Sequence, residues 1–346
     1  MGTKQEQQPA RKEIIEVAPG VLVLQLDINF TGLGHVNCYA MEDERGFALV
    51  DPGLPGPRSW QDLETKLDAA GIPLNRIHSV IVTHSHPDHF GGAARLRHET
   101  GADIVTHRSF RLWWESSEPE GEDPEVDERP ALRPPFGRPT PWGGKPYEPS
   151  EADGRSHAEM RESMATALGA PRPSVRLDDA EVARYARRDW VAVHTPGHTP
   201  DHLCLFDPVE GVLLSGDHVL PSITPHISGL GNEADPLAEF FRSLDRMEQL
   251  EGVRTVLPAH GFPFSDLHGR VNAIKLHHYE RLEKLRSASR GLGRPAPVNE
   301  LMQHLFSERV WGSMAESETY AHLQHLRFAG EAHAEWRDDV LFYEIG

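Results

Sequence analysis

Residues 83–92 read THSHPDHFGG and hold three histidines and one aspartate within six positions. Neutral imidazole and carboxylate groups together suit Zn²⁺, Fe or Mn, and a carboxylate beside histidines also allows two metals to share a ligand. The proline after His86 interrupts a plain strand, so we expect a tight loop in which His84 and His86 converge. Asp88 and His89 would then point to a neighbouring position. The segment therefore predicts a metal site.

Four side chains in one segment cannot complete two metal sites, and other strand ends supply more ligand types. An apolar run leads into a Gly- or Pro-containing loop in VAVHTPGHTPDH, GVLLSGDHV and VRTVLPAHG, which place His198, Asp217 and His260 just beyond a strand. The segment FALVDPGLPG adds Asp51, whose carboxylate could orient a metal-bound histidine through its free N–H. We expect these loops to meet.

Three further histidines lie near these loops. His202 and His218 flank two of them, and we expect each to support a ligand loop or to lie at the surface. A hydrogen bond from either one to a ligand or to the reacting oxygen is the alternative. His226 follows the Asp217 loop in LPSITPHISG, so we expect it to line the substrate pocket.

The elements that must position these residues alternate between strands and helices. Short apolar, β-branched runs at 13–26 and 36–51 predict adjacent strands, and 59–72 has helical spacing before a strand at 78–84. Later segments continue the alternation: helix 91–100, strands 102–107, 190–195, 202–207 and 211–217, helix 236–250 and strand 253–260. Such mixing predicts an α/β layered fold, in which ligands bind at the carboxyl ends of the strands.

An insertion at about 108–175 interrupts this pattern. From Glu115 to Glu128 there are eight acidic residues and no basic one, and the stretch that follows is dense in Pro and Gly. We expect either a lid-like insertion or a solvated loop. Trp113 and Trp114 beside it would wall an apolar acyl pocket or anchor the insertion to the core.

A second change follows Gly261. The pattern predicts a long helix at 266–290, a linker at 291–297, helices near 298–308 and 317–329, and a final hairpin. This order is typical of a winged-helix module, so we predict domains at 1–265 and 266–346. The helix at 317–329 lacks the basic face that DNA reading requires, so we expect the module to serve packing or homodimer formation.

Composition excludes several classes of function. The 346 residues carry 35 Lys and Arg against 53 Asp and Glu, a formal charge of −18 that disfavours nucleic acid as a partner. The two cysteines, Cys38 and Cys204, suit a reducing compartment and packing roles. No apolar run reaches the ~20 residues of a membrane helix, and no signal peptide is evident. We expect a cytoplasmic protein with no membrane span.

The ordered ligand series resembles the metallo-β-lactamase superfamily over residues from about 15 to 265. The resemblance implies a four-layer αββα sandwich that binds two metals. The first metal would be held by His84, His86 and His198, the second by Asp88, His89 and His260, and Asp217 would bridge them. The C-terminal module resembles the winged-helix tail of the subgroup containing the lactamase-like protein 2 (endoribonuclease) branch and the polyketide-associated thioesterases.

The implied chemistry is hydrolysis of an ester-like carbonyl. Two Zn²⁺ ions, with Fe or Mn as alternatives, would share a water, lower its pKa toward ~7 and provide a bridging hydroxide. Asp88 or Asp217 would take or return a proton. Asp217 stands where common β-lactamases of this family place a cysteine, which argues against antibiotic hydrolysis.

We expect an acyl thioester, CoA- or carrier-bound, or a related ester as the small-molecule substrate. A lactone is one alternative, although the tyrosine typical of lactonases after the bridging aspartate is absent. A metal-dependent endoribonuclease or phosphodiesterase is the second alternative. An iron-carrying redox member, like the flavodiiron branch, is the third.

Overall fold

The computed structural model of the chain describes residues 3–30, 32–112, 137, 139–148, 162, 171–231 and 233–346. Most of the predicted insertion, including Trp113 and Trp114, lies outside the described residues. The described segment 139–148 reaches the C-terminal region, where the indole N–H of Trp142 donates a hydrogen bond to Glu316 (3.1 Å).

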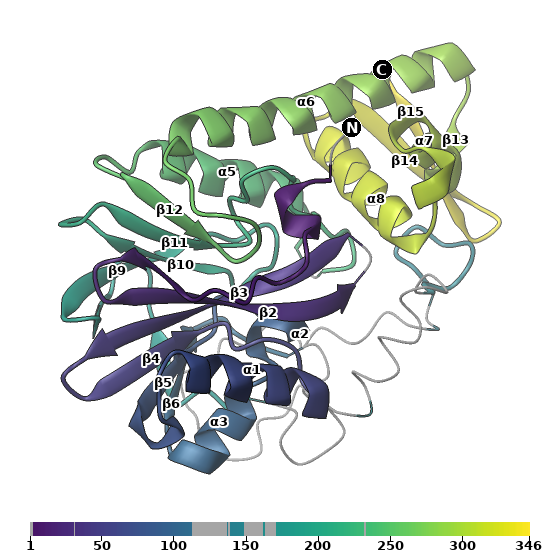
Figure 1. The fold of residues 1–346 in the computed structure, drawn as a ribbon. Helices are drawn as coiled ribbons and strands as arrows, with labels where there is room; N and C mark the ends of the chain where they lie inside the picture. The colour runs from purple at the N-terminus through teal and green to yellow at the C-terminus, as the bar shows by residue number, and fades with distance from the viewer. Residues whose placement is uncertain are drawn as a thin grey trace.

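A seven-stranded sheet forms the first half of the fold (Figure 1). Its strands lie in chain order: β1 (Ile15–Ala18), β2 (Val21–Phe30), β3 (Leu33–Asp43), β4 (Gly46–Val50), β5 (Ile77–Ile81), β6 (Asp103–His107) and β7 (Val175–Leu177). β1 to β4 pair antiparallel through short turns, whereas β4 to β7 pair in parallel. Parallel neighbours need longer crossovers, and helices supply the first two of these.

The crossover helices cover the outer face of this sheet. They are α1 (Pro57–Ala69), the short helices η2 (Leu74–Arg76) and α2 (Pro87–Phe90), and α3 (Ala93–Thr100). Trp60 and Leu63 of α1 and Leu96 of α3 are buried in one cluster with Leu49 and Val80 of the sheet. Their helical spacing places them on one face, which buries its apolar surface against the strands.

A five-stranded sheet forms the second half of the sandwich. Its order is β12 (Thr255–Pro258), β11 (Val212–Gly216), β10 (Leu203–Asp207), β9 (Arg188–His194) and β8 (Val182–Tyr185). Only the β11–β12 pair is parallel, and α5 (Pro236–Glu248) lies in its crossover. Phe240 and Leu244 of α5 pack against Val256 of β12 in a single core cluster.

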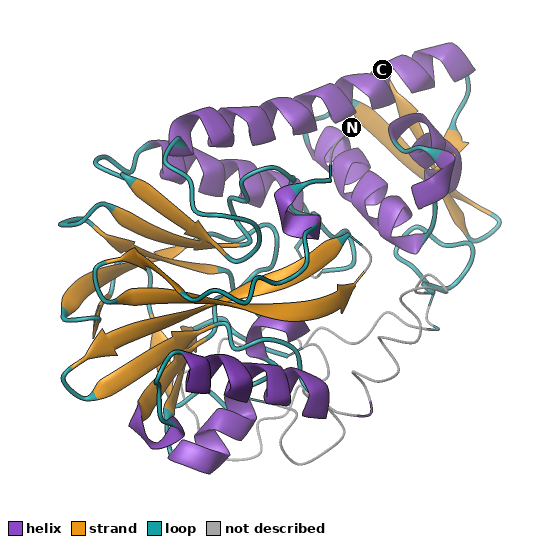
Figure 2. Cartoon of the chain, in the orientation of Figure 1, coloured by secondary structure: helices purple, strands orange, loops and turns teal. Residues whose placement is uncertain are grey.

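The two sheets pack face to face. Their shared core contains Tyr39 and Val50 from the first sheet and Trp190, Leu205 and Leu257 from the second, all buried. Helices lie on the outer side of each sheet (Figure 2). Successive strand residues point to opposite faces, which explains why each sheet carries one apolar face inward and another toward its helices. The predicted four-layer αββα architecture is confirmed.

The C-terminal region packs against α5. It contains α6 (Leu267–Leu292), β13 (Ala296–Pro297), α7 (Val298–Leu305), η3 (Glu308–Val310), α8 (Ser313–Phe328), β14 (Ala332–Arg337) and β15 (Val340–Ile345). The strands form a small sheet in the order β13-β15-β14. The order of helices and hairpin agrees with the prediction, while the winged-helix assignment and the boundary at 265/266 stay predictions. The apolar core of α5 continues into α6 and α8.

The predicted tight loop brings His84 and His86 together, and a turn of helix follows at 87–90, because proline is favourable at the first helical position. Two predicted bounds were wrong. The expected linker 291–297 is shorter, since α6 runs to Leu292 and Ala296–Pro297 pairs with β15. α8 begins at Ser313, four residues before the predicted start.

Among the described residues, no helix combines the length and the apolar character needed to cross a membrane. The 3-10 helix η1 (Gln5–Gln7) near the N-terminus is not an isolated tail. Its Glu6 is fully buried, and the carboxylate accepts hydrogen bonds from the backbone N–H groups of Ser222 (2.7 Å) and Ile223 (3.0 Å).

Candidate metal centre

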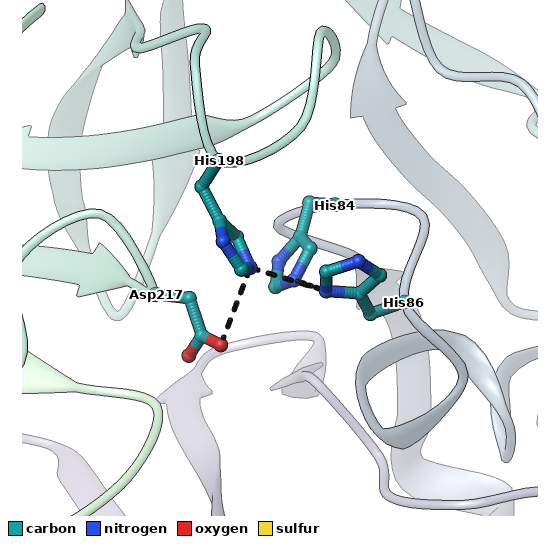
Figure 3. Close-up of side chains that lie close together, drawn as sticks. All are labelled: His84, His86, His198 and Asp217. Atoms are coloured by element: carbon teal, nitrogen blue, oxygen red, sulfur yellow. Dashed lines mark hydrogen bonds and ion pairs between the residues drawn. The ribbon is translucent and has the colours of Figure 1, made fainter. Parts of the chain in front are cut away.

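The ends of three strands deliver the first four predicted ligands to one place. β5 leads to His84 and His86, β9 to His198 and β11 to Asp217, and Figure 3 shows these four side chains converging. One ligand atom from each lies within 4.8 Å of the others. The structure thus brings together residues 133 positions apart in the sequence, as the strand-end pattern predicts.

The nitrogen atoms of this first group approach closely. Nδ1 of His86 lies 2.9 Å from Nε2 of His84 and 3.1 Å from Nε2 of His198. Nε2 of His198 is also 3.5 Å from Oδ2 of Asp217. Three nitrogens and a carboxylate oxygen therefore face a common point.

Hydrogen bonds on the far side of two rings fix their tautomers. The Thr83 hydroxyl donates to Oδ2 of Asp51 (2.7 Å), so it must accept from Nδ1–H of His84 (3.0 Å). Nδ1–H of His198 donates to the backbone carbonyl of His226 (2.8 Å). Nε2 of each ring therefore carries a lone pair. Both of these lone pairs face Nδ1 of His86, and one proton there cannot form a full hydrogen bond to each of them. A cation at this point could be bound by all three nitrogens.

The second group consists of Asp88, His89 and His260, whose ligand atoms also lie within 4.8 Å of one another. Nδ1–H of His89 donates to Asp51 (2.8 Å), and Nδ1–H of His260 donates to the carbonyl of His35 (2.6 Å). Nε2 of both rings is buried and makes no hydrogen bond among the described residues. Each of these nitrogens lies 3.5 Å from Oδ2 of Asp88.

Asp217 faces both groups. Its Oδ1 lies 3.3 Å from Nε2 of His260, and its Oδ2 lies 3.5 Å from Nε2 of His198 and 3.8 Å from Nε2 of His89. Once Nε2 of each ring is deprotonated, as metal binding requires, lone pairs of nitrogen and oxygen face one another with no donor between them. This donor set fits two divalent cations that share Asp217.

The pKa values of the histidines shift in opposite directions in the two groups. Burial and the neighbouring imidazoles hold the pKa of His84 well below its usual value, so this ring stays neutral, as a metal ligand must. Burial also lowers the pKa of His89, but the carboxylates of Asp88, Asp51 and Asp217 outweigh it and raise the pKa to about 10. The second group therefore carries surplus negative charge that attracts a cation.

Asp51 supports both groups, as expected for an orienting carboxylate. Its two oxygens accept from the backbone N–H of Thr83 (2.8 Å), from the Thr83 hydroxyl and from His89. Its backbone adopts a left-handed conformation (φ 54°) at the end of β4, which asparagine and aspartate tolerate better than most residues.

Two glycines explain how the ligand loops fit. A Cβ on Gly91 would lie 2.0 Å from the backbone nitrogen of Pro55, so glycine lets the histidine-rich segment approach the loop that follows Asp51. Gly197 has φ +132°, and a Cβ there would lie 2.4 Å from Cα of Phe240 in α5. These contacts place His198 through close backbone packing.

The remaining predicted histidines have different surroundings. His202 accepts the backbone N–H of Asp217 at Nε2 (3.0 Å), while its Nδ1–H donates to Thr195 (2.7 Å), so it supports the Asp217 loop. His218 is buried edge-on against Phe240, and burial lowers the pKa of His218 to about 3. Neither histidine belongs to the two groups.

His226 contributes its backbone carbonyl to His198, and its partly exposed ring faces Glu318 of α8 (Nδ1 to Oε2, 3.5 Å). The sequence reasoning missed Thr83, His35 and Glu318. Thr83 directly precedes a ligand and had a visible signal, because a hydroxyl beside a metal-bound histidine can fix its tautomer. His35 acts through its backbone, and Glu318 reaches the site from a distant helix, so neither had one.

Comparison with known proteins gives a concordant picture. A family model described as "Metallo-beta-lactamase superfamily" matches residues 31–287. The probable metallo-hydrolase YqjP of Bacillus subtilis is 23% identical over 90% of this chain and 94% of its own length. The atrochrysone carboxyl ACP thioesterase AacuM of Aspergillus aculeatus is 24% identical over 89% of this chain and 77% of its own.

A solved structure is also similar along almost the whole chain. The metallo-beta-lactamase family protein of Thermus thermophilus has a TM-score of 0.76 and 29% sequence identity. The alignment covers 96% of this chain and 100% of that one, so the similarity includes the region after residue 265.

Proposed function

Because this chain belongs to the metallo-beta-lactamase superfamily and is a metal-dependent hydrolase, we propose that it cleaves an acyl thioester, CoA- or carrier-bound, at a centre with two Zn²⁺ ions. The observation that carries the proposal is the position of Asp217, whose carboxylate faces both groups of ligand-type residues. A shared carboxylate is typical of dinuclear hydrolytic sites.

The residues divide into two ligand sets. His84, His86 and His198 would hold one cation, Asp88, His89 and His260 the other, and Asp217 both. A cation pair held there would lower the pKa of a shared water toward ~7 and polarise the substrate carbonyl. Iron or manganese could be bound by the same side chains, so the choice of Zn²⁺ is itself proposed.

The chain's own carboxylates would handle the proton. Oδ2 of Asp88 lies between the two histidines of the second group, 3.5 Å from each Nε2, and Asp217 lies beside both groups. We assign to one of these carboxylates the proton of the attacking water, which it would return to the leaving sulfur. The thioester carbon–sulfur bond breaks as the new carbon–oxygen bond forms, giving a carboxylic acid and a thiol.

The choice of substrate is supported by relatives and by charge. Several fungal relatives, 24–34% identical to this chain in the aligned regions, carry the name atrochrysone carboxyl ACP thioesterase. The formal charge of −18 opposes binding of an RNA backbone. We also propose a cytoplasmic location and a homodimer.

The test uses the purified full chain with acyl-CoA and acyl-pantetheine thioesters, followed by release of free thiol. Parallel reactions contain an acyl-homoserine lactone or single-stranded RNA, and each is run with and without a chelator. We expect thiol release that the chelator abolishes and added Zn²⁺ restores. Asp217→Asn should lose it, whereas Asp43→Asn, at a buried aspartate paired with Arg45, should retain it.

Other outcomes would change the proposal in defined ways. Lactone turnover without thiol release would replace the thioester by a lactone and leave the hydrolase in place. Chelator-sensitive RNA cleavage without thiol release would overturn the carbonyl chemistry itself. Absence of bound metal in the native protein would overturn the centre.

A further inference from the structure

The loop between Asp217 and α5 is held from the side of the C-terminal region. Ser317 of α8 accepts a hydrogen bond from the backbone N–H of Gly229 (3.0 Å), and a Cβ on Gly229 would lie 2.6 Å from the Tyr320 ring. The guanidinium of Arg270 in α6 donates to the carbonyls of Leu220 (2.5 Å) and Ile223 (2.5 Å). The loop therefore lies directly against α6 and α8.

His226 stands in the middle of this loop and makes two different contacts. Its backbone carbonyl accepts the Nδ1–H of His198 (2.8 Å), which directs Nε2 of His198 toward the first group. Its ring nitrogen Nδ1 lies 3.5 Å from Oε2 of Glu318. One residue thus connects a predicted metal ligand to α8.

Glu318 is suited to hold this ring in place. It is buried, and its Oε1 forms an ion pair with Nη1 of Arg281 in α6 (2.9 Å). Burial raises the pKa of Glu318, but Arg281 and His226 outweigh burial and keep it well below its usual range. The carboxylate is therefore charged, paired and fixed between two helices.

Glu318 also lies near His278 and His322, a third group of ligand-type residues. A metal here is less suitable than the arrangement present. Nδ1–H of His322 donates to the carbonyl of Glu318 (2.7 Å), so Nε2 of His322 accepts from Nδ1–H of His278 (3.0 Å). A cation beside Glu318 would also face the Arg281 guanidinium. The group is a buried polar bridge between α6 and α8.

We propose that Glu318 is a positioning residue of the metal centre, which holds His226 and thereby fixes the backbone carbonyl that orients His198. The inference rests on the proposed role of His198 as a metal ligand. It makes the C-terminal helices part of the support of the first metal group. A partner that orients a metal-bound histidine typically contributes 10–100-fold to metal affinity.

The test measures Zn²⁺ affinity, because binding can be followed independently of turnover. Full-length wild type, Glu318→Ala and Glu318→Gln are titrated with Zn²⁺ in competition with a chromophoric chelator. We expect Glu318→Ala to weaken the affinity for one of the two Zn²⁺ ions by about 10–100-fold and to leave the affinity for the other unchanged. Glu318→Gln, which keeps an oxygen that can accept from His226, should recover part of the loss.

A matched control and a second variant separate positioning from general damage. Glu316→Ala removes a carboxylate on the same helix that contacts Trp142, and it should leave both affinities unchanged. His226→Ala keeps the backbone carbonyl but loses the ring, so it should reproduce the effect of Glu318→Ala. Cobalt-substituted samples should show a changed d–d absorption for both variants.

The double variant gives the decisive comparison. If the two side chains act through one contact, Glu318→Ala combined with His226→Ala should lose no more affinity than either single variant. Unchanged Zn²⁺ binding in His226→Ala, or losses that multiply in the double variant, would overturn the inference. A wild type that binds no metal would instead overturn the proposed function.

Discussion

Replacement of Asp51 by asparagine tests the role of hydrogen-bond direction in the centre. The carboxylate accepts from the Thr83 backbone N–H at Oδ1, and from the Thr83 hydroxyl and His89 at Oδ2. Asparagine has nearly the same shape, but one of its two terminal atoms becomes an NH₂ donor. A donor must then face either the Thr83 N–H or the His89 Nδ1–H.

The two orientations of the asparagine amide differ in free energy, and this difference reduces the affinity for Zn²⁺. Without a cation, His89 can move its proton to Nε2 and accept from the new NH₂ group. Binding requires the proton to return to Nδ1, so the amide must turn its NH₂ group toward the buried backbone N–H of Thr83. An unsatisfied buried donor costs about 1–3 kcal/mol, and 2 kcal/mol corresponds to about 30-fold.

We therefore expect Asp51→Asn to weaken the Zn²⁺ affinity of the second group by about 30-fold and to leave the affinity of the first group unchanged. A two-site titration against a chelating dye measures both affinities, and Asp43→Asn is the matched control because its hydrogen bonds go to Arg45. Equal affinities in Asp51→Asn and wild type would refute the reasoning. Equal weakening of both ions would show that Thr83 and His84 depend on the charge as well.

Three further predictions concern the shared ligand, a ligand loop and acid stability. Asp217→Asn should reduce the bound Zn²⁺ measured by elemental analysis and lower turnover at least 10–100-fold; full occupancy would argue against a shared carboxylate. Gly197→Ala forces a Cβ to 2.4 Å from Cα of Phe240, so Zn²⁺ titration should show loss of the first ion, and unchanged affinity would contradict this placement. Burial lowers the pKa of His322 to about 4 from 6.5, so the unfolded chain binds more protons between these values and the fold loses stability as pH falls through this window. Urea unfolding of metal-free protein should show that His322→Gln lacks this contribution of about 3 kcal/mol, and an unchanged pH slope would contradict it.

The convergence of the predicted ligands could be foreseen because each one follows a recognisable local pattern. His84, His198, Asp217 and His260 all come after apolar strands that end in Gly or Pro turns. β9, β11 and β12 of the five-stranded sheet run in the same direction and end at one edge, and β5 of the facing sheet brings His84 to the same place. The same logic placed Asp51 beside the group.

The supporting contacts were not predictable in the same way. Glu318 joins the centre through an ion pair with Arg281 and a contact to His226, which lies 92 positions away. Glu6 stands in a polar sequence before the first predicted strand, yet its carboxylate binds the loop at Ser222. These residue types are usually exposed, and only the three-dimensional packing reveals their partners. The short strands β7 and β8 were missed because three or four residues carry too little periodicity.

The hydrogen bond from His260 to the carbonyl of His35 joins residues 225 positions apart, and Glu6 reaches Ser222 across 216. Such distant pairs close late, because the chain loses loop entropy before any contact compensates for it. During synthesis the first sheet can form while its future partners are still inside the ribosome. The second group is complete only once residue 260 has been synthesised, so a cation held there would stabilise the finished protein and would not guide its earliest folding.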